Sequence, residues 1–185
     1  LSVRDRLLLW GEFTHHAHYF AYCYSFWYLA PSLISPWIGV WFVLGWVAYF
    51  VTERIWREGR RVFSPKVMAS GHLLVAATLI IMPHLNALGV ALGWFVTGIG
   101  GGTAYMLGNA GQRGPRELFE DRGHVAGLVG AALIAFLAKD NRAAAELSVI
   151  FGACLAVTTA IIFSLVSPLR RDRNPQRNGE TSARR

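Results

Sequence analysis

The sequence predicts an all-α, polytopic membrane protein with six transmembrane helices. Three stretches without any Asp, Glu, Lys or Arg carry this prediction: residues 13–52, 67–112 and 147–169. About 20 helical residues cross the roughly 30 Å hydrocarbon core of a bilayer, so each of the first two stretches is long enough for two spans. The 185 residues are 54% hydrophobic and 16% charged, with a mean hydropathy of +0.36, which is high for a soluble domain.

Prolines and charged loops divide the chain into a six-helix transmembrane domain at residues 13–168. The first two spans are separated by a turn that Pro31 and Pro36 bracket, and a proline suits the first turn of the second helix. The fifth span is short and is expected to extend into its flanks. The expected spans are residues 13–34, 36–52, 67–82, 88–107, 125–138 and 147–166.

The two ends of the chain differ from this domain in composition. Residues 1–12 mix charged residues with leucines, which predicts an amphipathic lead-in that lies along the membrane surface. Residues 169–185 form a polar, basic tail that is expected to be disordered.

Most Arg and Lys residues lie in loops 53–66 and 108–124 and in the tail, whereas the turns after the first and third spans carry none. By the positive-inside rule, both termini are expected in the cytoplasm, with the chain integral to a bacterial-type inner (plasma) membrane. The net charge of +7 is confined to the ends of apolar segments and to the tail. This placement indicates the lipid bilayer, and not nucleic acid, as the partner.

The stretch FTHHAHYFAYCYSFWY, at residues 13–28, raises the question of a functional site. His15, His18 and Tyr22 share one stripe of the expected first helix. Polar side chains within a span usually face the bundle interior or a water-filled cavity, so these residues are candidates to line a substrate path. Tyr105 and Asn109, one turn apart near the end of the fourth span, are the other candidates. The competing interpretation is simple anchoring of His and Tyr at headgroup depth.

Metal and cofactor sites are not expected. No carboxylate or cysteine lies beside His15 and His18 to complete a metal site. A haem held between two helices needs an axial histidine on each helix, and the first span has histidines only near one end, although His72 and His84 lie twelve residues apart. His72 and His84 are interpreted as interfacial residues, and ligation of haem or pigment by a single histidine stays open.

Catalysis is not expected either. The spans contain no paired carboxylates, nucleophile elbow or phosphate-binding loop. The run GIGGG lies inside an apolar span and does not follow a strand, so it does not fit a dinucleotide-binding turn.

Three stretches resemble one six-helix half of a major facilitator superfamily transporter. WREGRR resembles the end of the family's G-x-x-x-D-R-x-G-R-R loop, and GWFVTGIGGGTAYMLGNA resembles its glycine-rich fourth helix. EDRGHVAGLVGAAL resembles the entry to its fifth helix. The matching positions are Arg57, Gly59, Arg60 and Arg61 in the loop, and Gly98, Gly100, Gly101 and Gly102 in the fourth helix.

The resemblance implies roles for these positions. The loop residues would form a cytoplasmic gate, and the glycines would let helix backbones pack closely. The chain departs from the family pattern at the loop's first glycine, where it has Thr52, and at its acidic position, where it has Trp56. Trp94 stands where the family often has an arginine in the fourth helix, and the antiport pattern G-x-x-x-G-P is missing from the fifth.

A complete member of that family has two such halves. The resemblance therefore implies a transporter unit that moves a small solute by alternating access with a second six-helix unit. The chain would be a fragment of a longer polypeptide, one subunit of a split transporter, or half of a homodimer. The alternative from another class is a non-transporting accessory subunit of a larger membrane complex, for example one that contains haem or pigment.

Overall fold

The chain folds into six α-helices in a computed structural model that describes residues 2–29, 37–58, 64–104, 113–138 and 140–166. These ranges contain no strand, so the all-α prediction is confirmed. A short 3₁₀ helix, η1 (Met82–His84), follows the third helix. The helices are α1 (Val3–Leu29), α2 (Trp37–Glu58), α3 (Pro65–Ile81), α4 (Ala87–Ala104), α5 (Arg113–Leu137) and α6 (Asn141–Val166).

Helix α1 begins well before the expected first span, because Ser2 and Asp5 form a capping box. The backbone N–H of Asp5 donates to Ser2 Oγ (3.1 Å), and the backbone N–H of Ser2 donates to Asp5 Oδ2 (3.2 Å). The segment expected to lie separately on the membrane surface is therefore continuous with the first span. Within it, Leu9 is buried and the Trp10 ring packs edge-on against Phe119 of α5.

Charged residues extend three other helices beyond the expected spans. Arg54 pairs with Glu58 one turn later (2.6 Å) in the last turns of α2. Helix α5 begins at Arg113, so much of the expected loop 108–124 is helical. Helix α6 begins at Asn141 because Asp140 caps it, accepting a hydrogen bond from the backbone N–H of Ala143 (2.7 Å).

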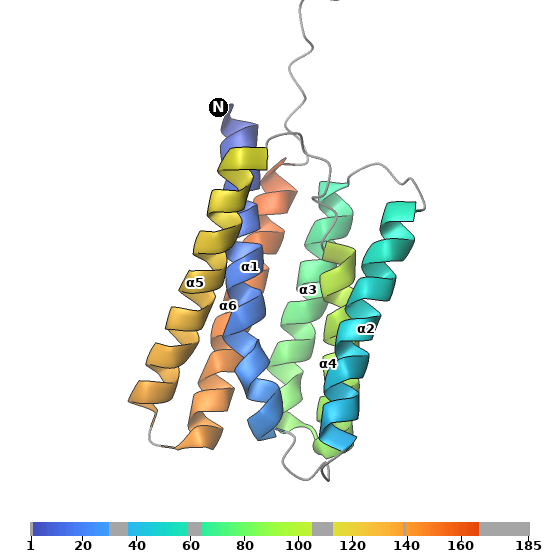
Figure 1. The fold of residues 1–185 in the computed structure, drawn as a ribbon, viewed down its shortest axis with the longest axis vertical. Helices are drawn as coiled ribbons and strands as arrows, with labels where there is room; N and C mark the ends of the chain where they lie inside the picture. Colours follow the sequence, from blue (N-terminus) through green and yellow to red (C-terminus); the bar gives the residue numbers. More distant parts are fainter. Residues whose placement is uncertain (1, 30–36, 59–63, 105–112, 139, 167–185) are drawn as a thin grey trace, which may run out of the picture.

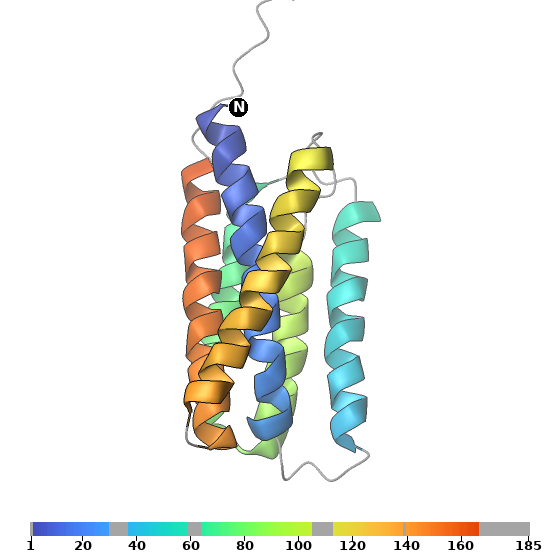
Figure 2. The same ribbon diagram turned by 60° about the vertical axis from the view of Figure 1, so that its left-hand side comes forward.

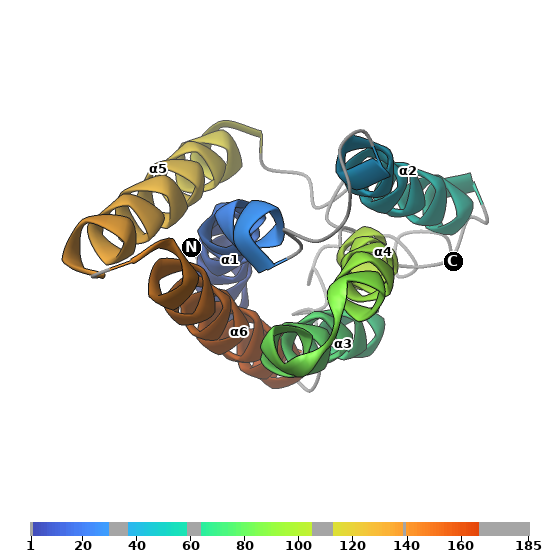
Figure 3. The same cartoon turned by 90° about the horizontal axis from the view of Figure 1, so that it is seen from below.

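The helices alternate in direction along the bundle (Figures 1 and 2). Helix α1 packs against α5 and α6, helix α4 packs against α2 and α3, and α3 packs against α6. Seen from one end, α5 and α2 lie on the outside of the two groups, and the pair α3 and α6 joins them (Figure 3).

The main core lies where α1, α3, α4 and α6 meet. Phe26 of α1 and Leu79 of α3 are fully buried, and Phe26 packs against the Trp94 ring of α4. Trp94 stacks on Phe42 of α2 and donates its indole N–H to the carbonyl of Phe42 (3.1 Å). Helices α1 and α3 both contribute side chains to this core, and both contribute to the site described below.

Within the part of the chain that the structure describes, three helices are long and apolar enough to cross a membrane, and not six as the sequence predicts. They are Trp37–Trp56 in α2, Pro65–His84 in α3 with η1, and Asn141–Val166 in α6. The apolar part of α4, Ala87–Thr103, is shorter. Helices α1 and α5 fall short because α1 carries charges and histidines in its first half and the first ten residues of α5 include six charged ones.

The outer surface supports assignment of the chain to the membrane proteins. Large apolar side chains cover the outward faces of α2 and α5, where Phe136 and Leu137 are 84% and 77% exposed. Soluble monomers rarely expose apolar patches of this extent. On α2 the exposed side chains include Val40, Val43, Leu44, Val47, Phe50 and Val51.

Candidate metal centre

Helix α1 directs an unusual number of polar side chains into the bundle. Six of them are buried, although Glu, Thr and Ser are mostly exposed in proteins and His is intermediate. The set comprises Glu12, Thr14, His15, His16, His18 and Ser25. Because α5 and α6 pack along α1, these side chains are covered by the chain itself.

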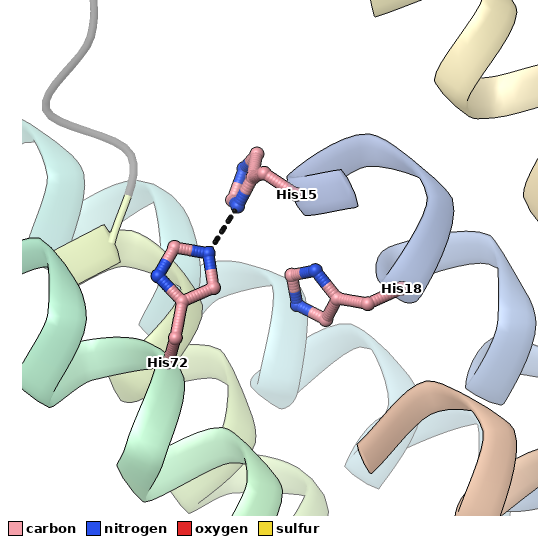
Figure 4. Close-up of side chains that lie close together, drawn as sticks. All are labelled: His15, His18 and His72. Atoms are coloured by element: carbon pink, nitrogen blue, oxygen red, sulfur yellow. Dashed lines mark hydrogen bonds between the residues drawn. The ribbon is translucent and has the colours of Figure 1, made fainter. Parts of the chain in front are cut away.

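Three imidazole rings converge where α1 faces α3. His15 and His18 come from α1, His72 comes from α3, and their rings point toward one another (Figure 4). The exposed fractions are 2%, 0% and 0%, respectively. Each ring offers one nitrogen, and the three nitrogens lie within 4.8 Å of one another. We call these three residues the histidine triad.

Hydrogen bonds fix the orientation of His72. Its Nδ1 lies 2.7 Å from the carbonyl of Met68, one turn earlier in α3, and a carbonyl can only accept. Nδ1 therefore carries the proton, which leaves a lone pair on Nε2. That nitrogen lies 2.9 Å from His15 Nδ1, which donates to it. The lone pair of His72 thus points into the triad.

His16 lies beside the triad on the α5 side of α1, and its ring packs edge-on against that of His15, with centroids 4.9 Å apart. The His16 ring also packs edge-on against His124, and its Nδ1 lies 2.9 Å from the carbonyl of Glu12. The Glu12 carboxylate oxygen Oε1 lies 3.8 Å from the same ring nitrogen. Glu12 is 1% exposed, so a carboxylate lies inside the bundle one turn before the triad begins.

The triad has the ligand chemistry of a transition-metal site. Imidazole nitrogens bind Zn²⁺, Cu²⁺, Ni²⁺ and iron, and a set of three histidines with a fourth position for water is a known zinc arrangement. A haem iron between two axial nitrogens would hold them about 4 Å apart, twice a metal–nitrogen bond of about 2.0 Å. The 2.9 Å separation of His15 and His72 leaves no space for a macrocycle between those two rings.

The structure brings two of the five substrate-path candidates together, His15 and His18. Both are covered by this chain's own helices. Tyr22 lies on α1, and its side chain is not among those described, while Tyr105 and Asn109 lie outside the described residues. Arg57 is in the last turn of α2, and Gly59, Arg60 and Arg61 also lie outside the described residues.

Sequence reasoning missed His72, which it interpreted as interfacial. Along their own helix, no third member of the triad lies beside His15 and His18, because the third imidazole comes from α3. A signal was present: the first and third spans were both expected to start in the cytoplasm, and both carry histidines within six residues of their starts at 13 and 67. Histidines at matching depth on two spans can meet.

The glycines of α4 lie at helix contacts. A Cβ atom added at Gly98 would meet the backbone carbonyl of Gly45, and one at Gly102 would meet that of Tyr49, both on α2. Gly100 faces α3 at Val75, and Gly101 faces the Tyr49 ring. The α1–α5 contact is built in the same way, with Gly123 and Gly127 of α5 against the carbonyls of Phe13 and Ala17. Small residues four positions apart allow such close approach.

In comparisons with known proteins, the chain matched no family model, no curated protein and no solved structure. Its function must therefore be inferred from the arrangement of its own residues.

Proposed function

We propose that the chain is one six-helix half of a transporter of the major facilitator kind. It would move a small solute by alternating access, rocking against a second six-helix unit that is either another copy or a related chain. The lipid bilayer, the second unit and the solute are its partners in this proposal, and α1 and α4 line the path.

The supporting observation is a repeated pattern of helix packing. Helix α1 packs against α5 and α6, and α4 packs against α2 and α3. If α1, α2 and α3 are matched with α4, α5 and α6 in that order, the α1–α5 contact corresponds to the α4–α2 contact, and the α1–α6 contact corresponds to the α4–α3 contact. The α3–α6 contact corresponds to itself. Corresponding helices run in opposite directions (Figure 1). Two inverted three-helix repeats of this kind are built into each half of the major facilitator fold.

All six helices cross the membrane in this proposal. Polar residues are tolerated in a span when they face the bundle interior, which is where the polar side chains of α1 lie. The 18 residues of α4 extend about 27 Å, close to the hydrocarbon thickness. Helix α5 presents Leu128, Val129 and Leu133 outward after its charged first turns.

The charge distribution favours cytoplasmic termini. The starts of α1, α3 and α5 and the ends of α2, α4 and α6 lie at the same end of the bundle (Figure 1). Basic residues near this end include Arg4 in the first turn of α1, Arg54 near the end of α2 and Lys66 at the start of α3. Such clustering is typical of the cytoplasmic side.

The test is the composition and colour of the intact particle. The chain would be extracted in a mild detergent and examined by native mass spectrometry and visible absorption. A colourless particle with two copies of this chain, or with one other six-span chain, is the expected result. A single copy, or a coloured assembly of several unrelated subunits, would contradict the proposal.

The second candidate is an accessory subunit of a larger membrane complex. The wide apolar faces of α2 and α5 favour it, because these faces are exposed and could pack against subunits other than a second half. The same experiment separates the two candidates, since this one requires the multi-subunit particle.

A further inference from the structure

We propose that His15, His18 and His72 bind one divalent transition-metal ion of the Zn²⁺ class and thereby tie α1 to α3. The site uses only residues of this chain. It is therefore independent of transport and of the identity of any second unit.

The triad is close to the geometry that such an ion requires. With metal–nitrogen bonds of about 2.0–2.1 Å, two ligand nitrogens of a tetrahedral site lie about 3.3 Å apart. The nitrogens of His15 and His72 are 2.9 Å apart, and the largest separation in the triad is within 4.8 Å. An ion would take the place of the proton that His15 donates to His72. Side-chain rotations that move the nitrogens by about 1 Å then complete the set.

The surroundings of His72 are those of a metal ligand. A metal-binding histidine almost always donates its second ring N–H to a carbonyl or carboxylate, which fixes the tautomer and aims the other nitrogen at the metal. The Nδ1–H of His72 does this with the Met68 carbonyl at 2.7 Å. The ring also packs against Phe163 of α6, with ring centroids 5.6 Å apart, which further restrains it.

A carboxyl group lies close to the triad along α1. Three neutral imidazoles supply no negative charge, and a buried divalent ion is costly without some. Among the described side chains, Glu12 is a buried acidic residue; it stands three residues before His15, and its Oε1 lies 3.8 Å from Nδ1 of His16. Helix α1 therefore carries an acidic group within one turn of the triad.

The ion would join two helices that each pack mainly against other helices of the bundle. Helices α1 and α3 each pack along α6, and the triad is the place where their polar side chains meet. Binding to the folded state alone raises stability by mass action, so excess metal should raise the melting temperature.

The proposal is tested with Co²⁺ as a spectroscopic probe. The full chain, without a polyhistidine tag, would be purified in mild detergent, treated with a chelator and titrated with Co²⁺. We expect one ion per chain, visible absorption bands of a four-coordinate site, and their disappearance when Zn²⁺ is added. If the helical wild-type chain shows no such bands, the proposal is wrong, whatever the variants do.

Variants assign the ion to the triad. His18→Gln and His72→Gln should each weaken Co²⁺ binding at least about 10-fold, the smallest loss typical of changes around a metal site. His84→Gln is the matched control, because His84 is exposed in η1 and lies outside the triad. Equal binding by wild type and His72→Gln would overturn the assignment.

A ligand exchange covers the case in which the glutamine variants do not fold. His72→Cys keeps a ligand at the same position, and it should bind Co²⁺ with an added thiolate-to-metal charge-transfer band. A folded His72→Cys variant that binds the ion without that band would place the ion elsewhere and contradict the proposal.

Discussion

Gly98 and Gly102 stand one helical turn apart on α4, and each lies against a backbone carbonyl of α2. At Gly98 the neighbour is the carbonyl of Gly45, so both helices contribute a glycine to the same crossing. Backbone atoms cannot move aside as the end of a flexible side chain can. The distance between α2 and α4 is therefore set by the absence of a Cβ atom at this position.

Replacing Gly98 with alanine should consequently destabilise the bundle. The added methyl group must push α2 away, and overpacking of this kind typically costs about 1–3 kcal/mol. Gly39→Ala is the matched control, because a Cβ atom at Gly39 of α2 meets nothing within 4 Å. There the better helix propensity of alanine should raise stability by about 0.5–1 kcal/mol. Unfolding by SDS in mixed micelles measures both free energies, and a change of the same sign in both variants would refute the close-approach argument.

The residues of the triad were only partly predictable. The spacing of His15 and His18 placed them on one stripe, which follows from helix geometry alone. Their meeting with His72 depends on which face α3 turns toward α1, and tertiary packing decides that. Tyr22 lies on the same helix face as His15 and His18 by its spacing. The sequence pattern does not distinguish a helix face that packs against another helix from one that lines a substrate path.

At the scale of helices, the ends were harder to predict than the number. Each of the six segments that the sequence predicts as a span contains a helix in the structure. Long apolar segments separated by charged or proline-containing loops are a strong signal for separate helices. The ends were displaced because charged residues can continue a helix into water, as Arg54 and Glu58 do in α2. The largest difference is at the start of α5, which begins at Arg113 and not at residue 125. Its first turns are rich in charged residues, so their low hydropathy predicts a loop.

Helix α4 begins at a polar side-chain cap, which gives a prediction at the scale of the helix. Asn86 Oδ1 accepts a hydrogen bond from the backbone N–H of Gly89 (2.9 Å). Asn86→Ala removes this bond and should lower the free energy of unfolding by about 0.5–2 kcal/mol.

Asn86→Asp is the control, because aspartate caps equally well and also complements the helix dipole. The free energies of unfolding of the two variants would be compared with that of wild type in mixed micelles. A loss in Asn86→Asp as large as in Asn86→Ala would show that the amide group serves another purpose.

At the scale of the whole molecule, the number of spans and the sidedness of the loops are linked. If only α2, α3 and α6 cross the membrane, the connections after η1, after α4 and after α5 all lie on one side. If all six helices cross, the connection between α4 and α5 lies on the opposite side from the other two. The position of residue 112 thus distinguishes three spans from six.

Single-cysteine labelling measures this difference. Cys23 and Cys154 would be replaced by alanine, and Ser64→Cys, Asn86→Cys, Gln112→Cys and Asp140→Cys introduced one at a time. With six spans and cytoplasmic termini, a membrane-impermeant maleimide should label intact cells at positions 86 and 140, and inverted vesicles at positions 64 and 112. A permeant maleimide should label all four and serves as the control. Labelling of residue 112 from the same side as residue 86 would leave α4 outside the membrane, and the inverted-repeat proposal would then fail, because α4 could not be the counterpart of a spanning α1.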